Sequence, residues 1–459
     1  MFSLPLAILA PLIAVFVVRK ITSDAGRKIA AIAATLTLLS AFWANWQVRV
    51  ASGWLVVDSL NTVTIALFAA ITLSTIIFAP RRDCTSQFLS NTLLTLAATT
   101  MAYASGNLIL FTIAWALGLL PFVSKETVPK AVRAILFISL AALIAGAVLL
   151  GIERSNAQSP DPFSMFGAHP SSSMYAMWGF GFLGFAAVLR TGLFPFHSWP
   201  ALLLGQGPLL GGGLLVNAQL GAFLIARAMV SMLPDAEREL LVILSNLGLF
   251  TSVYTAILGV VERNPRRLLA LLTVSQSAIL FAGITSASVE GIAGGLVHWF
   301  VIAVSTTGLI GVYRGLEARI GEDAGADLSG RFLGLATQFP RLAVFFAGSS
   351  LALVGLPGTL GFCSEDLLLH GSLQADPLIG IAMPLATALN AVQVLRLFSH
   401  LFLGTRGTLG EGVPDALPRE RWVLSACLLF LVWGGLAPSA LVRLQTPAAE
   451  AIAGTAQHR

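Results

Sequence analysis

Charge is scarce in this sequence. Only 11% of the 459 residues are Asp, Glu, Lys or Arg, and 56% are hydrophobic, whereas soluble domains carry about 25% charged and 45–50% apolar residues. This composition excludes an ordinary soluble enzyme and a disordered chain. Cysteine is scarce too. Cys84, Cys363 and Cys427 are scattered along the chain, which excludes a disulfide scaffold and any metal or redox spacing.

Nucleotide and iron–sulfur motifs are also missing. No glycine-rich loop follows a predicted strand, no Walker sequence occurs and no cysteine cluster is present. We therefore expect no bound cofactor, and we expect any energy to come from an ion gradient or a partner. The net charge of +5 is typical of a membrane protein with Lys and Arg in its cytoplasmic loops, so no nucleic-acid partner is predicted.

Long apolar runs are what the sequence has instead. Runs of about 20 residues recur along the whole chain, which predicts an all-α polytopic membrane protein; a membrane β-barrel would need short alternating segments. The first run lacks a basic start and a cleavage site, so we interpret it as a retained helix. About fourteen spans are predicted, at 2–18, 29–47, 57–79, 87–105, 107–123, 131–152, 175–192, 207–230, 240–260, 268–285, 291–313, 342–358, 360–402 (broken) and 422–442.

Basic residues gather in alternate loops of this arrangement. They lie at 19–28, 81–82, 125–133 and 263–267, in the first, third, fifth and ninth loops, whereas the even loops carry few. Because Lys and Arg concentrate in cytoplasmic loops, the pattern predicts that these four loops are cytoplasmic and that the N-terminus lies outside.

Ionisable residues at membrane depth are costly, so each is a candidate for an ion path. Arg190 comes shortly before Pro195 and His197, and a proline-broken helix exposes backbone dipoles to a cavity. One interpretation is a charged site beside a helix break. The alternative is an arginine whose side chain extends to the cytoplasmic interface, followed by interfacial aromatic residues.

A second helix break is predicted at Pro357 and Gly358, before Glu365 and Asp366. Two carboxylates in an apolar run indicate a functional site, and an interfacial turn is the alternative. We predict that Glu365 is buried, where an apolar interior favours the neutral form of a carboxyl group. Two breaks about 165 residues apart indicate two related halves, an arrangement that many transporters use.

Other polar residues at membrane depth have two interpretations each. His298 lies in an apolar helix and is either a packing residue or, if a wet path exists, a proton carrier that faces the protein interior. Asn217 and Gln219 either bridge a hydrogen-bonded chain or hold helices together.

Four segments in order resemble motifs of the proton-conducting membrane transporter family. Residues 190–199 resemble its Lys-Ser-Ala-Gln-x-Pro-Phe-His-x-Trp motif, and 264–276 resemble Asp-x-Lys-Arg-x-Leu-Ala with a following Ser-Gln. Residues 361–366 resemble Gly-Phe-x-Ser-Lys-Asp, and 107–117 resemble the helix that carries Trp-Glu-Leu. The family includes antiporter-like membrane subunits of respiratory complex I, Mrp antiporter subunits and the membrane subunit of the Dab inorganic-carbon transporter.

The resemblance implies one integral membrane domain over 1–459 with two broken helices in related halves. N-terminal helices would occupy 1–105, the first antiporter-like half 107–260, the second half 266–403 and a C-terminal helix 422–442. No long lateral helix is expected after residue 442.

The sequence departs from the family at the residues that carry charge. The family's membrane Glu falls at Ala116, its first broken-helix Lys at Arg190, its central Lys at Thr306, one relay His at Ile302 and its second broken-helix Lys at Glu365, while His298 matches the other relay His. Burial can neutralise a lysine, but an arginine stays charged. A complete Lys/Glu relay therefore cannot be carried over to this chain.

The resemblance implies a multi-pass inner-membrane subunit that moves protons or monovalent cations together with other membrane subunits. It would not be catalytic alone, although it could belong to an NADH dehydrogenase-like translocase. One alternative is a Dab-type inorganic-carbon transporter with a soluble zinc subunit; another is a degenerate anchor subunit. A redox partner is the expectation for a respiratory complex.

Overall fold

The computed structural model describes residues 3–21, 23–45, 50–52, 54–124, 126–166, 173–233, 238–322, 327–330, 332–374, 376–405, 409–410 and 412–457. Phe2, residues 46–47 of the second predicted span and Lys125 of the fifth loop lie outside them.

The regular elements of the described residues are helices, apart from one short β-hairpin. The elements are α1 (Ser3–Val18), α2 (Ser23–Asn45), β1 (Val50–Ser52), β2 (Leu55–Val57), α3 (Ser59–Phe78), α4 (Ser86–Ala104), α5 (Leu108–Leu119), η1 (Leu120–Phe122), α6 (Lys130–Asn156), α7 (Met174–Thr191), α8 (Ser198–Gln206), α9 (Leu209–Asn217), α10 (Leu220–Leu224), η2 (Ile225–Met229), α11 (Val230–Met232), α12 (Glu239–Val261), α13 (Pro265–Thr285), α14 (Val289–Ile320), η4 (Leu335–Thr337), α15 (Pro340–Leu353), α16 (Leu360–Ser372), α17 (Ile379–Phe402), α18 (Pro418–Leu436) and α19 (Pro438–Gln457). The predicted all-α polytopic fold is confirmed.

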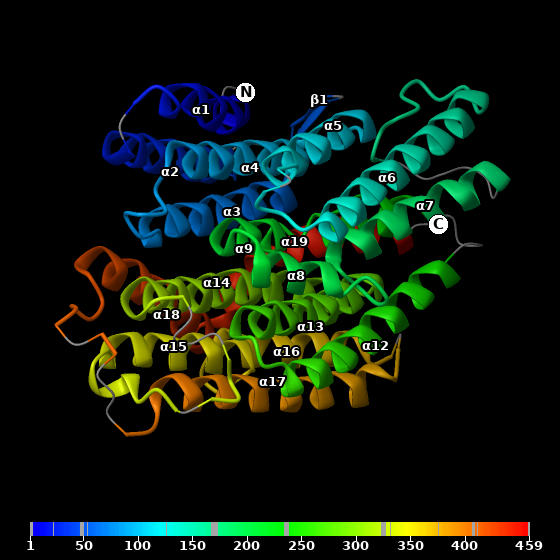
Figure 1. Cartoon of the computed structure of the whole chain (residues 1–459). Coiled ribbons are helices and arrows are strands. Elements are labelled where there is room, and N and C mark those ends of the chain that lie inside the picture. The colour runs from blue at the N-terminus through cyan, green and yellow to red at the C-terminus, as the bar shows by residue number, and fades with distance from the viewer. Residues whose placement is uncertain are drawn as a thin grey trace.

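Helices α13 and α14 form the centre of the bundle. Figure 1 shows them between the N-terminal helices α1–α5 and the helices α16 and α17. The membrane-length windows of α13 and α14 are 100% buried. Helix α14 has 32 residues and packs against α3, α9, α13, α15, α16, α18 and α19. The two central helices can therefore connect polar groups of both halves.

The predicted helix breaks coincide with proline and glycine. Pro195 lies between α7 and α8, and Gly192, which caps the C-terminus of α7, has a positive φ of 78°. Pro357 and Gly358 lie between α15 and α16, where Gly355 and Gly358 have φ of 69° and 89°. Glycine adopts these angles without the Cβ clash, and proline lacks the N–H that a continuing helix needs.

A third break was not predicted. The span expected over 207–230 is interrupted between α9 and α10, where Gln219 adopts a left-handed conformation with φ of 46°. Neither proline nor glycine occupies that position, so the surrounding packing must maintain a strained backbone that costs on the order of 1–3 kcal/mol.

The helix count and the C-terminus differ from the sequence-based expectation. Among the described residues, eight helices are long and apolar enough to cross a membrane, or nine if α18 and α19 form one span. The count of fourteen is therefore not established. The helix expected over 422–442 instead ends at Leu436, and α19 continues at 86° to it as far as Gln457. Helix α19 packs against α3, α11 and α14.

The basic loops lie at one end of the bundle. Arg27 of the first loop region donates a hydrogen bond to the Ile77 carbonyl near the third loop. Asp83 of the third loop lines the same cavity as Gly207, near the fifth loop, and Arg266, at the ninth. This common end is what the alternation of loop charges requires.

Candidate functional site

Three consecutive residues of α13 form hydrogen bonds with four neighbouring elements. Ser275 Oγ donates to the Ser252 carbonyl of α12 at 2.8 Å and accepts from Asn390 Nδ2 of α17 at 2.8 Å. The Gln276 side chain reaches α14, and Ser277 reaches the break before α10. Successive helical residues point about 100° apart. The buried side chains of Ser275, Gln276 and Ser277 therefore point to three different sides of α13.

His298 occupies the centre of this polar layer. The ring is fully buried, with Nε2 2.9 Å from Gln276 Oε1 and Nδ1 3.0 Å from Ser364 Oγ. Ser364 lies on α16, beside Glu365, and its hydroxyl also reaches the Gly361 carbonyl at 2.8 Å. The ring therefore faces the protein interior and links α13 to the helix that follows the second break.

Glu365 lies against the second break. Thr387 of α17 donates a hydrogen bond to Glu365 Oε1 at 3.2 Å. A Cβ placed on Gly355 would lie 2.6 Å from Glu365 Oε2, so the absence of a side chain there makes room for the carboxylate. Glu365 is half-buried within this chain.

Asp366 does not belong to this layer. Its side chain is 61% exposed and lies 3.3 Å from His370 Nδ1 on the outer face of α16. Adjacent helical positions differ by about 100°, so Asp366 faces outward when Ser364 and Glu365 face neighbouring helices. The sequence-based placement of Asp366 in the ion path is not supported by this geometry.

The unexpected break joins the first half to the centre. Gln219 Nε2 donates to Ser277 Oγ at 2.6 Å, and Thr306 of α14 donates to Asn217 Oδ1 at 2.9 Å. The Tyr103 hydroxyl of α4 donates to the Ala218 carbonyl. The two amides predicted at membrane depth thus lie at a break and bridge α14 and α13.

Arg190 is a buried cation without an acidic partner among the described residues. Its side chain is 5% exposed, and neither Nε nor Nη1 has a hydrogen-bond partner. The guanidinium lies over the Trp115 ring, 5.5 Å from the centroid. The buried guanidinium favours the interpretation of a charged site beside a helix break. A desolvated cation–π contact is worth about 2 kcal/mol, whereas removing one partner of a buried ion pair costs about 3–5 kcal/mol.

His197 and Pro195 lie at the edge of the first break. Pro195 is exposed, and the half-buried His197 ring stacks on Phe194 and packs edge-on against Tyr254 of α12. His197 therefore packs toward α12, whereas Arg190 packs on Trp115 of α5.

Sequence reasoning missed a buried ion pair. Arg227, in the π-helical turn η2, donates from Nη1 and Nη2 to Asp58 at 2.6 and 3.0 Å. Asp58 is the N-cap of α3. Burial would raise the pKa of this carboxyl, but the charge and hydrogen bonds of Arg227 hold the pKa below its usual value. An arginine near the end of an apolar run was the available signal.

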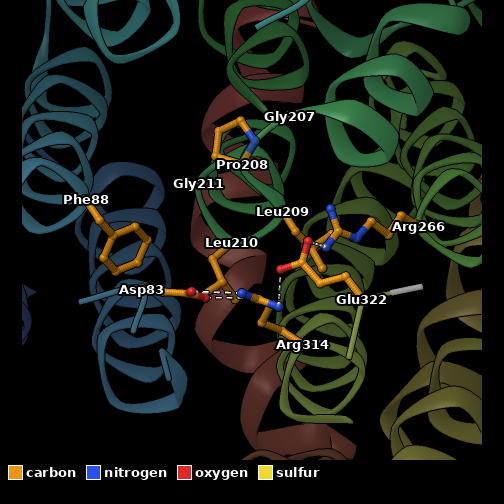
Figure 2. Close-up of a pocket in the computed structure, with 10 residues that line it drawn as sticks. All are labelled: Asp83, Phe88, Gly207, Pro208, Leu209, Leu210, Gly211, Arg266, Arg314 and Glu322. Carbon is orange, nitrogen blue, oxygen red and sulfur yellow. Dashed lines mark hydrogen bonds and ion pairs between the residues drawn. The ribbon is translucent and has the colours of Figure 1, made fainter. Parts of the chain in front are cut away.

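A second ionic cluster closes the end that carries the basic loops. Arg314 binds Asp83 through Nε and Nη2 at 2.7 and 2.8 Å, and Arg266 binds Glu317 at 2.6 and 2.8 Å. Figure 2 shows Glu322 between the two arginines, beside a cavity of about 300 Å³ that Gly207 and neighbouring residues line. Opposite charges are matched here, so the cluster clamps helix ends and carries no unpaired cation of the kind found at Arg190.

Comparison with protein families gives one match over most of the chain. The family model described as NADH:quinone oxidoreductase/Mrp antiporter, transmembrane, matches residues 105–390. NADH-quinone oxidoreductase subunit 13 of Thermus thermophilus is 30% identical over 292 residues, which are 62% of this chain and 60% of that protein. Subunit M of Rickettsia prowazekii is 24% identical over 61% of this chain and 56% of its own length. The chain thus spans less than two thirds of these curated relatives.

Solved structures share the fold. A chain of respiratory complex I from Thermus thermophilus with bound NADH superposes with a TM-score of 0.86 at 23% identity, over 99% of this chain and 98% of that chain. The Mrp complex of Dietzia sp. gives 0.81 at 18% identity, over 99% and 51%. The membrane-bound sulfane sulfur reductase, an archaeal complex, gives 0.83 at 18% identity, over 99% and 98%.

Proposed function

The chain belongs to the NADH:quinone oxidoreductase/Mrp antiporter transmembrane family, and on this premise we propose that it is a proton-translocating membrane subunit of a multi-subunit complex. The proposed proton path begins at the break before α10, in the first half, and continues through α13 and His298 to Glu365 in the second half. The complex lies in the inner membrane with the basic loops in the cytoplasm and the N-terminus outside, as the positive-inside rule requires.

The His298 site is the observation that supports this proposal most. A neutral ring can donate from Nε2 to Gln276 Oε1 and accept the Ser364 hydroxyl hydrogen at Nδ1. A protonated ring can keep the bond to Gln276 and donate from Nδ1 to Ser364 Oγ, once the hydroxyl hydrogen turns to the Gly361 carbonyl. One hydroxyl rotation therefore satisfies both charge states, which suits a group that gains and loses a proton.

Arg190 has a different role in this proposal. It is a fixed positive charge, because an arginine at this depth does not release its proton. Its positive charge contributes to the electrostatic field along the break before α10. The Tyr103 hydroxyl donates a hydrogen bond to the Ala218 carbonyl at this break. The first half thus contributes electrostatics, and the titratable His298 and Glu365 of the second half carry protons.

A structural anchor is the second candidate function. The specific observation in its favour is the loss of charge partners, since Ala116 and Thr306 occupy the positions of the family's Glu and central Lys. The relatives described above give no support to the inorganic-carbon alternative. The partners proposed are other membrane subunits and a redox subunit that supplies energy, with protons as the transported ion.

The decisive experiment compares two neighbouring carboxylates in the complete complex. The tagged chain is purified with its partners from its own membranes, and proton movement is measured in reconstituted vesicles at equal complex abundance. Glu365→Ala should reduce proton movement at least tenfold, Glu365→Asp should retain most of it, and Asp366→Ala is the matched control on the exposed face of the same helix. Normal proton movement in Glu365→Ala would refute the proposed path.

One further variant distinguishes a proton-translocating subunit from a structural anchor. Arg190→Lys combined with Ala116→Glu restores the family's pair. If the chain already conducts protons through its second half, this pair should leave their movement nearly unchanged or lower it. Proton movement that appears only in the double variant would establish that the native chain is an anchor.

A further inference from the structure

An apolar groove opens between α2, α3, α14, α18 and α19. Its volume is about 380 Å³, within the range of roughly 300–1,000 Å³ that small-molecule sites occupy. Aliphatic and aromatic side chains such as Ala66 and Phe430 form its walls, and among its lining residues only Thr62, Ser74 and Cys427 carry polar side-chain atoms. Helices α2, α3 and α14 are long and apolar enough to cross a membrane, and α18 and α19 form the bent pair, so the groove lies at membrane depth.

Three cations gather at one end of this groove. Arg27 lies within electrostatic reach of Arg81, Arg419 and the acid Asp24. A second acid, Asp83, lies near the same residues, around Cys84. Arg27 donates to the Ile77 carbonyl, which is less than one helical turn, or ~5 Å, beyond the groove residue Ser74 on α3.

The third cation, Arg419, lies on another helix that lines the groove. Arg419 is about two helical turns, or ~10 Å, from the groove residue Ala426 on α18. Its Nε is buried and has no hydrogen-bond partner in the described part of the chain. Two donors from different helices therefore converge where the groove reaches the loop end.

We propose that this groove binds an anionic phospholipid of the surrounding bilayer, with one acyl chain between α3 and α18 and the phosphate beside Arg27, Arg81 and Arg419. Three cations face two nearby carboxylates, Asp24 and Asp83, and Arg314 already binds Asp83. An anionic headgroup is therefore the complementary occupant. The site is independent of the proposed proton path.

The headgroup must determine the selectivity of this site. An acyl chain gains little by leaving lipid tails for apolar side chains, because the two surroundings are equally apolar. Each basic residue near the membrane surface attracts an anionic lipid by an amount that corresponds to about a fivefold change in affinity. Two of the three cations are therefore expected to account for an affinity ratio of roughly 25-fold.

Native mass spectrometry of the purified complex tests the proposal. The delipidated complex is titrated with dioleoylphosphatidylglycerol or with dioleoylphosphatidylcholine, and lipid-bound species are counted. Arg81→Gln combined with Arg419→Gln should weaken phosphatidylglycerol binding roughly 25-fold, whereas Lys130→Gln combined with Arg263→Gln, two exposed cations of other basic loops, should leave it unchanged.

A second variant tests the acyl chain. Ala66→Phe places a phenyl ring in the groove and should remove the bound lipid while the headgroup cations remain. Equal binding of the two lipids by the wild-type complex, or equal loss in the two double variants, would overturn the proposal. A density map of the complex that shows a neighbouring subunit's helix in the groove would also overturn it.

Discussion

Replacing His298 by leucine should destabilise the folded chain by about 1–2 kcal/mol. Leucine fills a similar volume, but it neither donates nor accepts a hydrogen bond. The substitution removes the 2.9 Å contact with Gln276 Oε1 and the 3.0 Å contact with Ser364 Oγ.

The two partners are not affected equally. Ser364 retains its bond to the Gly361 carbonyl at 2.8 Å. Gln276 would keep no side-chain hydrogen bond among the described residues. Its Nε2 has no partner there, and its Oε1 would lose the bond with His298. An unsatisfied buried amide costs about 1–3 kcal/mol in soluble proteins, and hydrogen bonds between membrane helices contribute about 0.6 kcal/mol on average and up to ~1.7. These two ranges together set the expected loss.

A second substitution separates stability from transport. Gln276→Leu removes the orphaned amide, and replacing both partners by apolar groups is nearly neutral. The double variant His298→Leu, Gln276→Leu should therefore recover most of the lost stability. Proton movement should stay absent, because neither leucine binds a proton.

The assays are thermal unfolding of the purified complex and proton movement in vesicles. Wild-type transport in the double variant would remove His298 from the path. An unchanged unfolding temperature in His298→Leu would show that the contact between His298 and Gln276 contributes nothing to stability.

Three further predictions concern the charge at the first break, an ion pair and a close backbone contact. Arg190→Lys should retain proton movement and Arg190→Gln should lose it in the vesicle assay; equal activity would contradict a role for the charge. Because the pKa of Asp58 is lower in the folded chain than its ordinary 3.8, its ion pair stabilises the fold at neutral pH and is lost as the pH falls below that value; Asp58→Asn should thus lower the unfolding temperature at pH 7 more than at pH 3. Gly361→Ala should abolish assembly, measured as complex abundance in the membrane, since its Cβ would lie 1.9 Å from the Ala352 carbonyl oxygen, whereas Gly181→Ala meets no atom within 4 Å.

The helices and their proline-dependent breaks follow from local features of the sequence. An apolar run long enough to cross a bilayer forms a helix because its backbone groups must be satisfied internally. Proline and glycine then interrupt the runs where Pro195 and Pro357 stand, since each changes its own backbone geometry. The alternation of basic loops likewise depends only on the order of helices.

The break at Gln219 and the ion pair of Arg227 with Asp58 depend on tertiary contacts. No local residue favours a left-handed turn at Gln219 as proline or glycine would. The two members of the ion pair are 169 positions apart, so only packing brings them together. Sequence reasoning could flag an arginine in an apolar run but could not identify its acid.

The candidate site likewise depends partly on local sequence and partly on tertiary contacts. The sequence by itself determined that His298 lies within a long apolar helix and that Arg190 and Glu365 lie beside proline or glycine breaks, because local residues set where a helix runs and where it stops. Only the tertiary structure decided that Glu365 lies against a break while Asp366 faces outward, and that Gln276 and Ser364 flank His298. Depth is a property of position along a helix, whereas a partner is a property of the angle at which helices pack, and that angle is set by contacts between residues distant in the sequence.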